Sequence, residues 1–108
     1  MNDYPLTIDE ICTWFRSKEL VSNSRGVILA GIHEGRSTDK PAAFADFDTE
    51  FGIGRITVWV SGEVDFEVLR RSDGKHIRMF HEQVSTLADS ALDQAVDGFM
   101  DGMTNPDG

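Results

Sequence analysis

The hydrophobic pattern is clearest in residues 54–79, where three runs of alternating apolar and polar side chains are joined by two short turns. Successive side chains of a β-strand point to opposite faces, so sustained alternation is typical of strands with one buried face. In the first two runs the apolar positions are Ile56, Val58, Val60, Val64, Phe66 and Val68. We therefore expect a β-meander here, and the rest of the chain can be placed relative to it.

The first turn of the meander predicts how its first two strands pair. Both apolar sets share one face if Val60 lies opposite Val64, with residues 61–63 forming a three-residue connection or a bulge. The pairs expected on the other face are Trp59 with Asp65 and Thr57 with Glu67.

The second turn contains Asp73 and Gly74, the preferred pair of a two-residue type I′ hairpin loop. A loop at this pair places Val68 opposite Met79 on the core face and starts a last strand at about residues 76–83. The other face of the sheet is then expected to present Trp59, Asp65, Glu67, Arg78 and Phe80.

Two further strands are expected before the meander. Residues 26–33 are β-branched and aliphatic, and Gly31 within them suggests a bulge or a close backbone approach. Residues 42–48 alternate more weakly, whereas residues 34–41 and 49–54 are predicted to form a loop and a connection.

A helix is expected near the N-terminus, from about residue 8 to residue 20. Thr7 and Glu10 have the spacing of a capping box, in which a Thr cap precedes a Glu by three positions. The apolar face of this helix is predicted to hold Ile8, Ile11, Cys12 and Phe15.

The chain is expected to end in a second helix, capped by Ser85 or Thr86 and followed by a frayed tail at residues 104–108. Its apolar stripe comprises Leu87, Ala88, Ala91, Leu92, Ala95, Val96, Phe99, Met100 and Met103. Four carboxylates, here called the Asp ridge, recur at every fourth position: Asp89, Asp93, Asp97 and Asp101. Like charges at this spacing destabilise a helix by roughly 0.2–0.5 kcal/mol per pair. The Asp ridge is therefore either the solvated face of an acidic protein or a surface for a basic partner.

The order of the elements, α-β-β-β-β-β-α, predicts an α+β fold. We expect one domain over residues 1–108, a two-layer sandwich whose antiparallel sheet of about five strands packs one face against both terminal helices. With 40% hydrophobic and 27% charged residues, the composition is that of a globular protein.

Charge and cysteine usage narrow the partners and the compartment. The net charge of −9 argues against nucleic acid and anionic membranes and suits a basic protein partner. One cysteine excludes an internal disulfide and fits a cytoplasmic protein. The N-terminal residues lack a signal-peptide pattern, and the longest apolar run, residues 27–32, is too short to span a membrane.

Candidate chemistry is sparse in this sequence. Asp46, Asp48 and Glu50 alternate and would share one strand face, but they lack the spacing of a known calcium loop. The three histidines are scattered, and no zinc, phosphate-loop or nucleophile motif is present, so we expect neither metal nor cofactor. Asp65 and Glu67 could form an acid and base pair of a small hydrolase. Alternatively, an aromatic side chain with acidic neighbours suits a protein interface, which here would hold Trp59, Glu63, Asp65 and Glu67.

The segment GRITVWVSGEVDFEVLRRSDGK, preceded by AFADFD, resembles the TriTu-type immunity proteins of bacterial polymorphic toxin systems. The resemblance covers roughly residues 44–75, and the flanking helices have a similar layout. Its matching positions are Trp59, Ser61, Gly62, Glu63, Asp65 and Glu67. It implies a cytoplasmic, non-enzymatic protein that binds and neutralises a cognate toxin.

Our leading hypothesis is thus an immunity-type inhibitor that binds a basic toxin through the Trp59 face, the Asp ridge, or both. The second hypothesis is a regulatory or secretion-system accessory module without a toxin partner. The third is a small hydrolase that uses Asp65 or Glu67.

Overall fold

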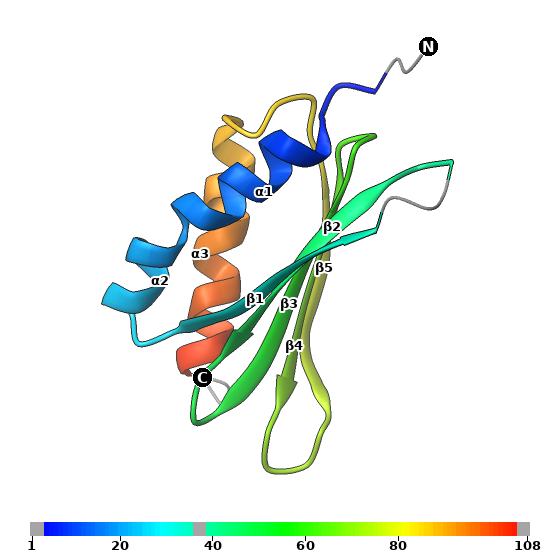
Figure 1. The fold of residues 1–108 in the computed structure, drawn as a ribbon. Coiled ribbons are helices and arrows are strands. Elements are labelled where there is room, and N and C mark those ends of the chain that lie inside the picture. The colour runs from blue at the N-terminus through cyan, green and yellow to red at the C-terminus, as the bar shows by residue number, and fades with distance from the viewer. Residues whose placement is uncertain (1–3, 36–38, 106–108) are drawn as a thin grey trace.

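The computed structural model describes residues 4–35 and 39–105, which form one antiparallel sheet and three helices. The elements are α1 (Ile8–Ser17), α2 (Glu19–Ser24), β1 (Ile28–Gly35), β2 (Ala42–Asp48), β3 (Gly52–Trp59), β4 (Glu63–Arg70), β5 (His76–Gln83) and α3 (Ser90–Thr104). The strands lie side by side in their sequence order, β1 to β5 (Figure 1). This arrangement confirms the predicted α+β fold and its five-stranded meander.

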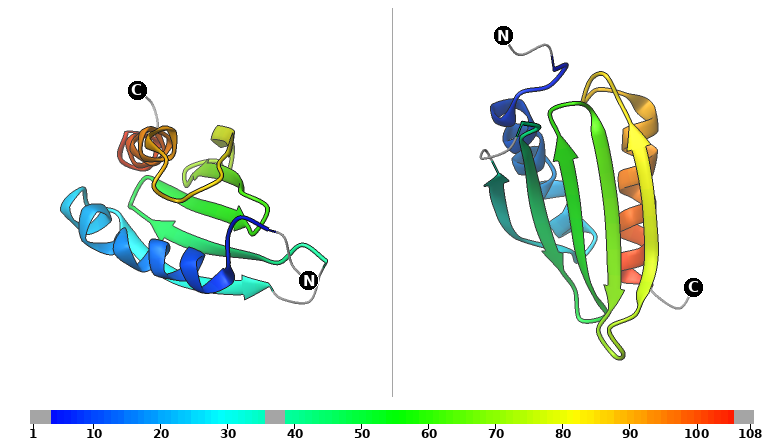
Figure 2. Two further views of the ribbon diagram at one scale, coloured as in Figure 1. Left: turned by 90° about the horizontal axis from the view of Figure 1, so that it is seen from above. Right: turned by 90° about the vertical axis from the view of Figure 1, so that its right-hand side faces the viewer.

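All three helices pack on one face of the sheet (Figure 2). The N-terminal helices α1 and α2 cover β1 and β2, whereas α3 lies across β3, β4 and β5. Within the described part of the chain, the other face has no layer of secondary structure over it. We call it the open face.

The core fills the space between the helices and the sheet. Phe99 of α3 is fully buried and lies at its centre, with its ring centroid 5.3 Å from that of Phe47 and 6.0 Å from that of Phe66. Gly54 of β3 lies directly beneath Phe99, where a Cβ atom would come within 2.5 Å of the Phe99 ring. The glycine therefore gives the aromatic ring room against the sheet.

The N-terminal helix begins as expected, but it ends earlier. Thr7 caps α1, since its hydroxyl oxygen accepts a hydrogen bond from the Glu10 N–H at 3.1 Å. The predicted end near residue 20 is wrong, because α1 stops at Ser17 and a separate short helix, α2, starts at Glu19. The apolar stripe stops after Phe15, so the next turn of a straight helix would have little to bury.

The first two strands differ from the prediction mainly at their ends. β1 starts later and continues through Gly35, inside the segment predicted as a loop, and residues 36–38 of that segment lie outside the described residues. The register shifts between Leu29 and Gly31, so the bulge expected near Gly31 is confirmed. β2 has its predicted bounds, whereas β3 begins at Gly52, inside the predicted connection.

The first hairpin has the predicted faces, but its register differs by two residues. The observed pairs are Val58 with Val64, Thr57 with Asp65, and Arg55 with Glu67. The loop begins earlier than predicted and is closed by the Gly62 N–H, which donates to the Trp59 carbonyl at 2.9 Å. Val60 remains buried because its backbone pairs with Pro41 and Leu6 instead of with β4. A shift by two preserves the side of every residue, so alternation alone could not detect it.

In the second hairpin, the side chains of β5 from Arg78 onward point to the side of the sheet opposite to the predicted one. The observed pairs are Phe66 with Phe80, Glu67 with Met79, and Val68 with Arg78. Two hydrogen bonds close a loop that is longer than the predicted two-residue turn, from Arg70 N–H to the Lys75 carbonyl and from Gly74 N–H to the Arg70 carbonyl. A bulge at Ile77, between the partners of Val68 and Leu69, then moves every following residue to the opposite side.

This bulge overturns three predicted positions. Met79 is not a core residue, because 66% of it is exposed on the open face. Arg78 and Phe80, expected on the open face, belong to the helix side of the sheet. The Arg78 stem packs against Gly102 of α3, and Phe80 stacks on Phe66 with centroids 4.6 Å apart.

The bulge predicts opposite results for two neighbouring truncations. We expect Phe80→Ala to lower the free energy of unfolding by about 2 kcal/mol, less than for a fully buried Phe because the ring is half-buried. Met79→Ala should change it by less than about 0.5 kcal/mol, since the side chain is exposed. Urea denaturation of both variants measures the change in the free energy of unfolding. A larger decrease for Met79→Ala than for Phe80→Ala would support the predicted register, which has no bulge.

The last helix also starts later than predicted. Asp89, not Ser85 or Thr86, is its cap, and the Asp89 carboxylate accepts a hydrogen bond from the Ala91 N–H at 2.9 Å. The buried stripe from Leu92 to Met103 is as expected. α3 includes Thr104, and residues 106–108 of the predicted tail lie outside the described residues. In the described segments, no helix combines the length and apolarity that crossing a membrane requires.

Candidate functional site

The Asp ridge lies beside the N-terminal helices. Asp89 is used as the helix cap, whereas the next three carboxylates project from α3 toward bases of the α1–α2 region. Lys18 Nζ lies 3.8 Å from Asp93, and Arg25 forms ion pairs with Asp97, at 3.5 Å, and with Asp101.

These ion pairs change the interpretation of the Asp ridge. The bases partly offset the repulsion between carboxylates one helical turn apart and connect α3 to the α1–α2 region of the same layer. The carboxylates of Asp93, Asp97 and Asp101 stay 63–75% exposed, so each pair stabilises the fold by no more than about 1 kcal/mol. The ridge thus has partners within the chain, which its sequence spacing does not reveal.

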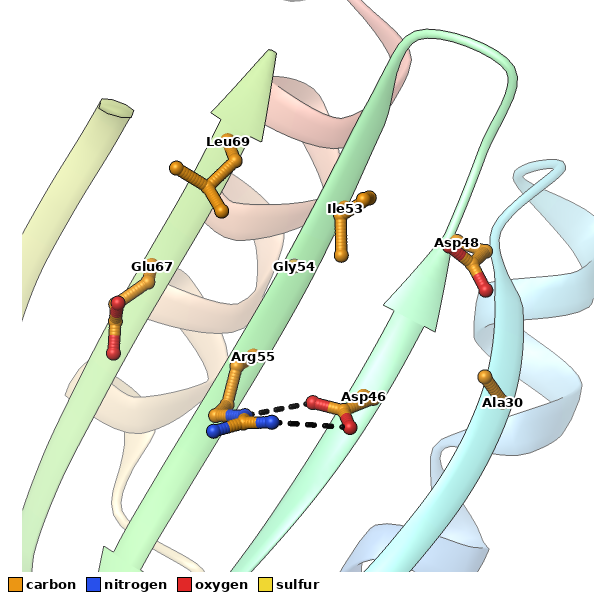
Figure 3. A pocket seen from close by; sticks show the side chains of 8 residues that line it. All are labelled: Ala30, Asp46, Asp48, Ile53, Gly54, Arg55, Glu67 and Leu69. Atoms are coloured by element: carbon orange, nitrogen blue, oxygen red, sulfur yellow. Dashed lines mark hydrogen bonds and ion pairs between the residues drawn. The ribbon is translucent and has the colours of Figure 1, made fainter. Parts of the chain in front are cut away.

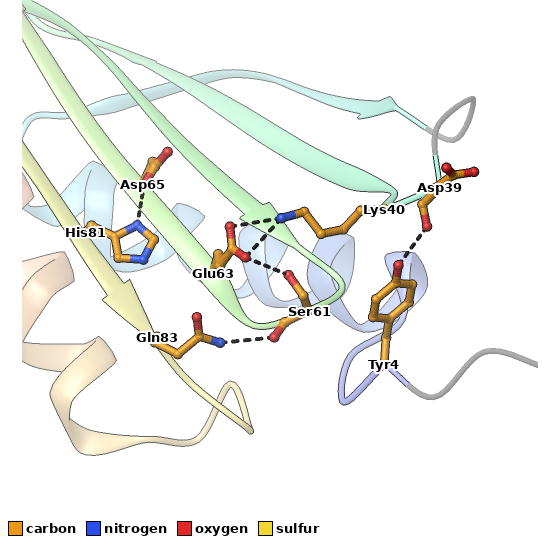
Figure 4. Close-up of polar contacts among 8 residues, drawn as sticks. All are labelled: Tyr4, Asp39, Lys40, Ser61, Glu63, Asp65, His81 and Gln83. Atoms are coloured by element: carbon orange, nitrogen blue, oxygen red, sulfur yellow. Dashed lines mark hydrogen bonds and ion pairs between the residues drawn. The ribbon is translucent and has the colours of Figure 1, made fainter.

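Trp59 lies at one end of the open face, next to the salt bridge between Lys40 and Glu63 that Figure 4 shows. Lys40 Nζ donates to both carboxylate oxygens of Glu63, at 2.9 and 3.1 Å, and lies 5.7 Å from the centre of the Trp59 ring. The hydrogen bonds from Lys40 lower the pKa of Glu63, against a smaller opposing effect of desolvation. This corner presents an aromatic surface and a carboxylate that is ionised at neutral pH.

Asp65 and Glu67 follow Glu63 along β4, and all three side chains point to the open face. Thr57, not Trp59, is the direct partner of Asp65, because of the register shift in the first hairpin. The Asp65 carboxylate lies 2.6 Å from His81 Nδ1 on β5 (Figure 4). The structure therefore places the four predicted residues of the Trp59 face on one surface and the Asp ridge on another.

The centre of the open face contains a charged and aromatic cluster that sequence reasoning missed. The Arg55 guanidinium donates two hydrogen bonds to Asp46, at 2.7 and 3.3 Å, and lies 4.1 Å from the centre of the Phe44 ring. The hydrogen bonds to Asp46 raise the pKa of Arg55, with a further contribution from the charge of Glu67. The alternation of residues 42–48 indicates that Phe44 and Asp46 share one face, but only the register of β2 with β3 shows that Arg55 lies beside them.

A hollow of about 410 Å³ opens beside this cluster (Figure 3). Its wall includes Ala30, Asp48, Ile53, Arg55, Glu67 and Leu69, around the backbone of Gly54. A second, smaller hollow of about 260 Å³ lies between β4 and β5 near Asp65, Met79 and His81. Both hollows belong to the open face.

Two of the three carboxylates that alternate in residues 46–50 have basic partners. Asp46 is held by Arg55, and Asp48 accepts a hydrogen bond from Arg71 at 2.7 Å. Among the residues that the structure describes, no group of three or more metal-binding side chains is present. Chemically, the open face offers paired charges, aromatic rings and shallow hollows, a combination typical of protein interfaces.

A comparison with protein families identifies the model described as "Immunity protein TriTu", which matches residues 9–102. The match includes all five strands and most of α1 and α3, so it extends well beyond residues 44–75 and confirms the resemblance seen there. A comparison with curated proteins gave no match.

Proposed function

We propose that this chain, which belongs to the TriTu family of immunity proteins, neutralises a cognate bacterial toxin by stoichiometric binding through the open face of its sheet. The observation that supports the proposal most directly is the family match over residues 9–102. In this proposal the chain acts in the cytoplasm of the cell that makes the toxin, as a single domain, and catalyses no reaction.

The open face is suited to a protein partner because a rigid sheet holds its side chains in place. Sites on regular elements are positioned more accurately than sites on loops, and they lose less conformational entropy on binding. Trp59 supplies an aromatic contact of the kind that dominates binding energy at interfaces. Its neighbour Lys40 is already ordered by Glu63, so this corner is preorganised.

The charges of the open face favour a basic toxin surface. The carboxylates on or beside this face are Asp46, Asp48, Glu63, Asp65 and Glu67, and the lysine and arginine side chains are Lys40, Arg55 and Arg71. Three histidines also lie beside these carboxylates: His33, His76 and His81. An excess of acid accelerates encounter with a basic partner and disfavours acidic competitors. The carboxylates of the Asp ridge have basic partners, as do those of the open face, so the open face is favoured for its aromatic contact at Trp59 and its hollows.

The test is co-expression with the C-terminal domain of a secreted protein whose gene lies next to this one. We expect the chain to restore growth of cells that express the toxin domain and to co-elute with it as a complex of defined stoichiometry in size-exclusion chromatography with light scattering. Growth arrest that persists although both proteins are soluble, with no complex formed, would refute the proposal and favour an accessory role.

Two triple variants with the same change in charge test the binding face. Neutralising the β4 carboxylates, with Glu63→Gln, Asp65→Asn and Glu67→Gln, should weaken toxin binding at least about 30-fold, or roughly 2 kcal/mol. The control neutralises the α3 carboxylates, with Asp93→Asn, Asp97→Asn and Asp101→Asn, and should change affinity less than about threefold. Isothermal titration calorimetry measures both, and the reverse ranking would assign binding to the Asp ridge.

A further inference from the structure

The large hollow of the open face lies between two rows of side chains that run across the strands. One row is Asp46, Arg55 and Glu67, and the other is Asp48, Ile53 and Leu69, as the strand registers require. Gly54 lies between Ile53 and Arg55 and points to the core, so the floor of the hollow is backbone (Figure 3). One wall is therefore charged and the other largely apolar.

Arg55, the basic side chain that lines this hollow, already has partners within the chain. Arg55 is directed toward β2, where Asp46 and the Phe44 ring hold its guanidinium. Its neighbour in the row is Glu67 on β4, the strand that flanks β3 on the side away from β2. Figure 3 shows the Glu67 carboxylate apart from the Arg55–Asp46 pair. The nearest base to Glu67 that we identify is His76, whose Nε2 atom lies 3.4 Å from the carboxylate.

We infer that this hollow receives an arginine or lysine side chain of the toxin, an assignment that rests on the proposed function. The aliphatic stem would pack on Ile53 and Leu69, and the cationic head would reach Glu67. Long basic side chains bury their stems on apolar surface while their charge meets a carboxylate, which is the combination that the two walls offer. A permanently charged head group also competes well with the His76 imidazole for this carboxylate.

The volume and charge of the hollow agree with this occupant. A space of about 410 Å³ accommodates a side chain of this length together with water. Of the three carboxylates at the hollow, Asp46 pairs with Arg55 and Asp48 with Arg71, whereas Glu67 lies beside the His76 imidazole. A cationic side chain therefore complements Glu67 better than an acidic or neutral one. Asp48 at the far side, although bound to Arg71, adds to the negative potential.

A toxin-independent test uses the capped peptide Gly-Arg-Gly and, as a neutral control of the same shape, Gly-citrulline-Gly. In ¹⁵N–¹H NMR titrations at low salt, we expect the arginine peptide to shift the amides of Ala30, residues 53–55 and residues 67–69, saturating at millimolar concentration. The citrulline peptide should produce less than a fifth of these shifts. Shifts spread evenly over the acidic surface, or larger at the Asp ridge, would overturn the assignment.

Two variants of this chain make the test specific. Glu67→Gln removes the charge, and Ala30→Phe fills the hollow from the β1 bulge without changing charge. Both should abolish the localised shifts, whereas Asp97→Asn on α3 should leave them unchanged. Thermal melts that match the parent chain establish that each variant is folded, and localised shifts that persist in both hollow variants would refute the inference.

The same variants separate this inference from the proposed function. If the toxin binds the parent chain, Glu67→Gln and Ala30→Phe should each weaken binding at least tenfold and Asp97→Asn less than threefold. Toxin binding that is unaffected by both hollow variants would refute the inference that the hollow receives a basic side chain of the toxin, but it would not contradict the proposed immunity function. If the toxin does not bind at all, the proposed function fails, and the peptide titration alone decides what the hollow binds.

Discussion

Replacing Gly62 with alanine is expected to lower the free energy of unfolding by about 2–5 kcal/mol. Gly62 has a φ of +94°, a left-handed conformation that costs other residues about 1–2 kcal/mol. In addition, an alanine Cβ would lie 1.9 Å from the Val84 carbonyl oxygen, a backbone atom that cannot turn away. The Val84 N–H donates to the Gly62 carbonyl at 2.8 Å, so relieving the clash also breaks this bond. Overpacking of this kind adds about 1–3 kcal/mol.

Gly74→Ala is the matched control for this prediction. Gly74 also has a positive φ, +70°, but a Cβ atom added there would have no neighbour within 4 Å, so only the conformational cost of about 1–2 kcal/mol applies. Chemical denaturation of the two variants separates the clash from the conformation. Equal losses would mean that the β3–β4 loop moves away from Val84 at no cost.

Truncating Phe99 to alanine is expected to cost about 3–5 kcal/mol, the range for a fully buried aromatic residue. The ring contacts Phe47 and Phe66 and fixes α3 to the centre of the sheet, so its removal leaves a cavity between the two layers. The same change at exposed Leu20 should cost less than about 0.5 kcal/mol. A loss below about 1 kcal/mol at Phe99, measured by urea denaturation, would contradict the described packing of α3.

A second substitution tests the same contact from the opposite side. Gly54→Ala alone introduces a methyl group 2.5 Å from the Phe99 ring and 2.6 Å from the Met103 sulfur, and should therefore destabilise the fold. In the Phe99→Ala background that methyl group enters the cavity, so its cost should fall by about 1 kcal/mol or more. Additive effects in this double-mutant cycle would show that the two residues do not share the space.

Alternation in the sequence predicts the side of a residue but not its partner. Ile56, Val58 and Val64 were correctly assigned to the core, because a period of two depends only on which residues are odd and even. The register could not be predicted in the same way, because it depends on the backbone partners of Val60, which come from distant segments of the chain. Met79 was misplaced by the bulge at Ile77, a residue type that gives no signal of irregularity.

Only part of the candidate site could be predicted, because alternation gives the face of a residue but not its neighbours on other elements. Trp59 and the β4 carboxylates were placed on one face by alternation, and the structure brings them together there. Arg55 was missed because its importance comes from Asp46 and Phe44 on a neighbouring strand. The bases that pair with the Asp ridge could not be found either, since helix spacing gives no information about how α3 packs against α1 and α2.

The order of the strands has a kinetic consequence for the proposed immunity function. Each strand pairs with the next in sequence, so the closures that form the sheet itself each span only a short loop. The helix α3, which follows all five strands in sequence, covers β3, β4 and β5 and contributes Phe99 to the core. Folding of this domain on the ribosome therefore cannot be completed before α3 has emerged, but it should then proceed quickly. In the proposed role, the amount of folded inhibitor would therefore follow the rate of its synthesis with little delay.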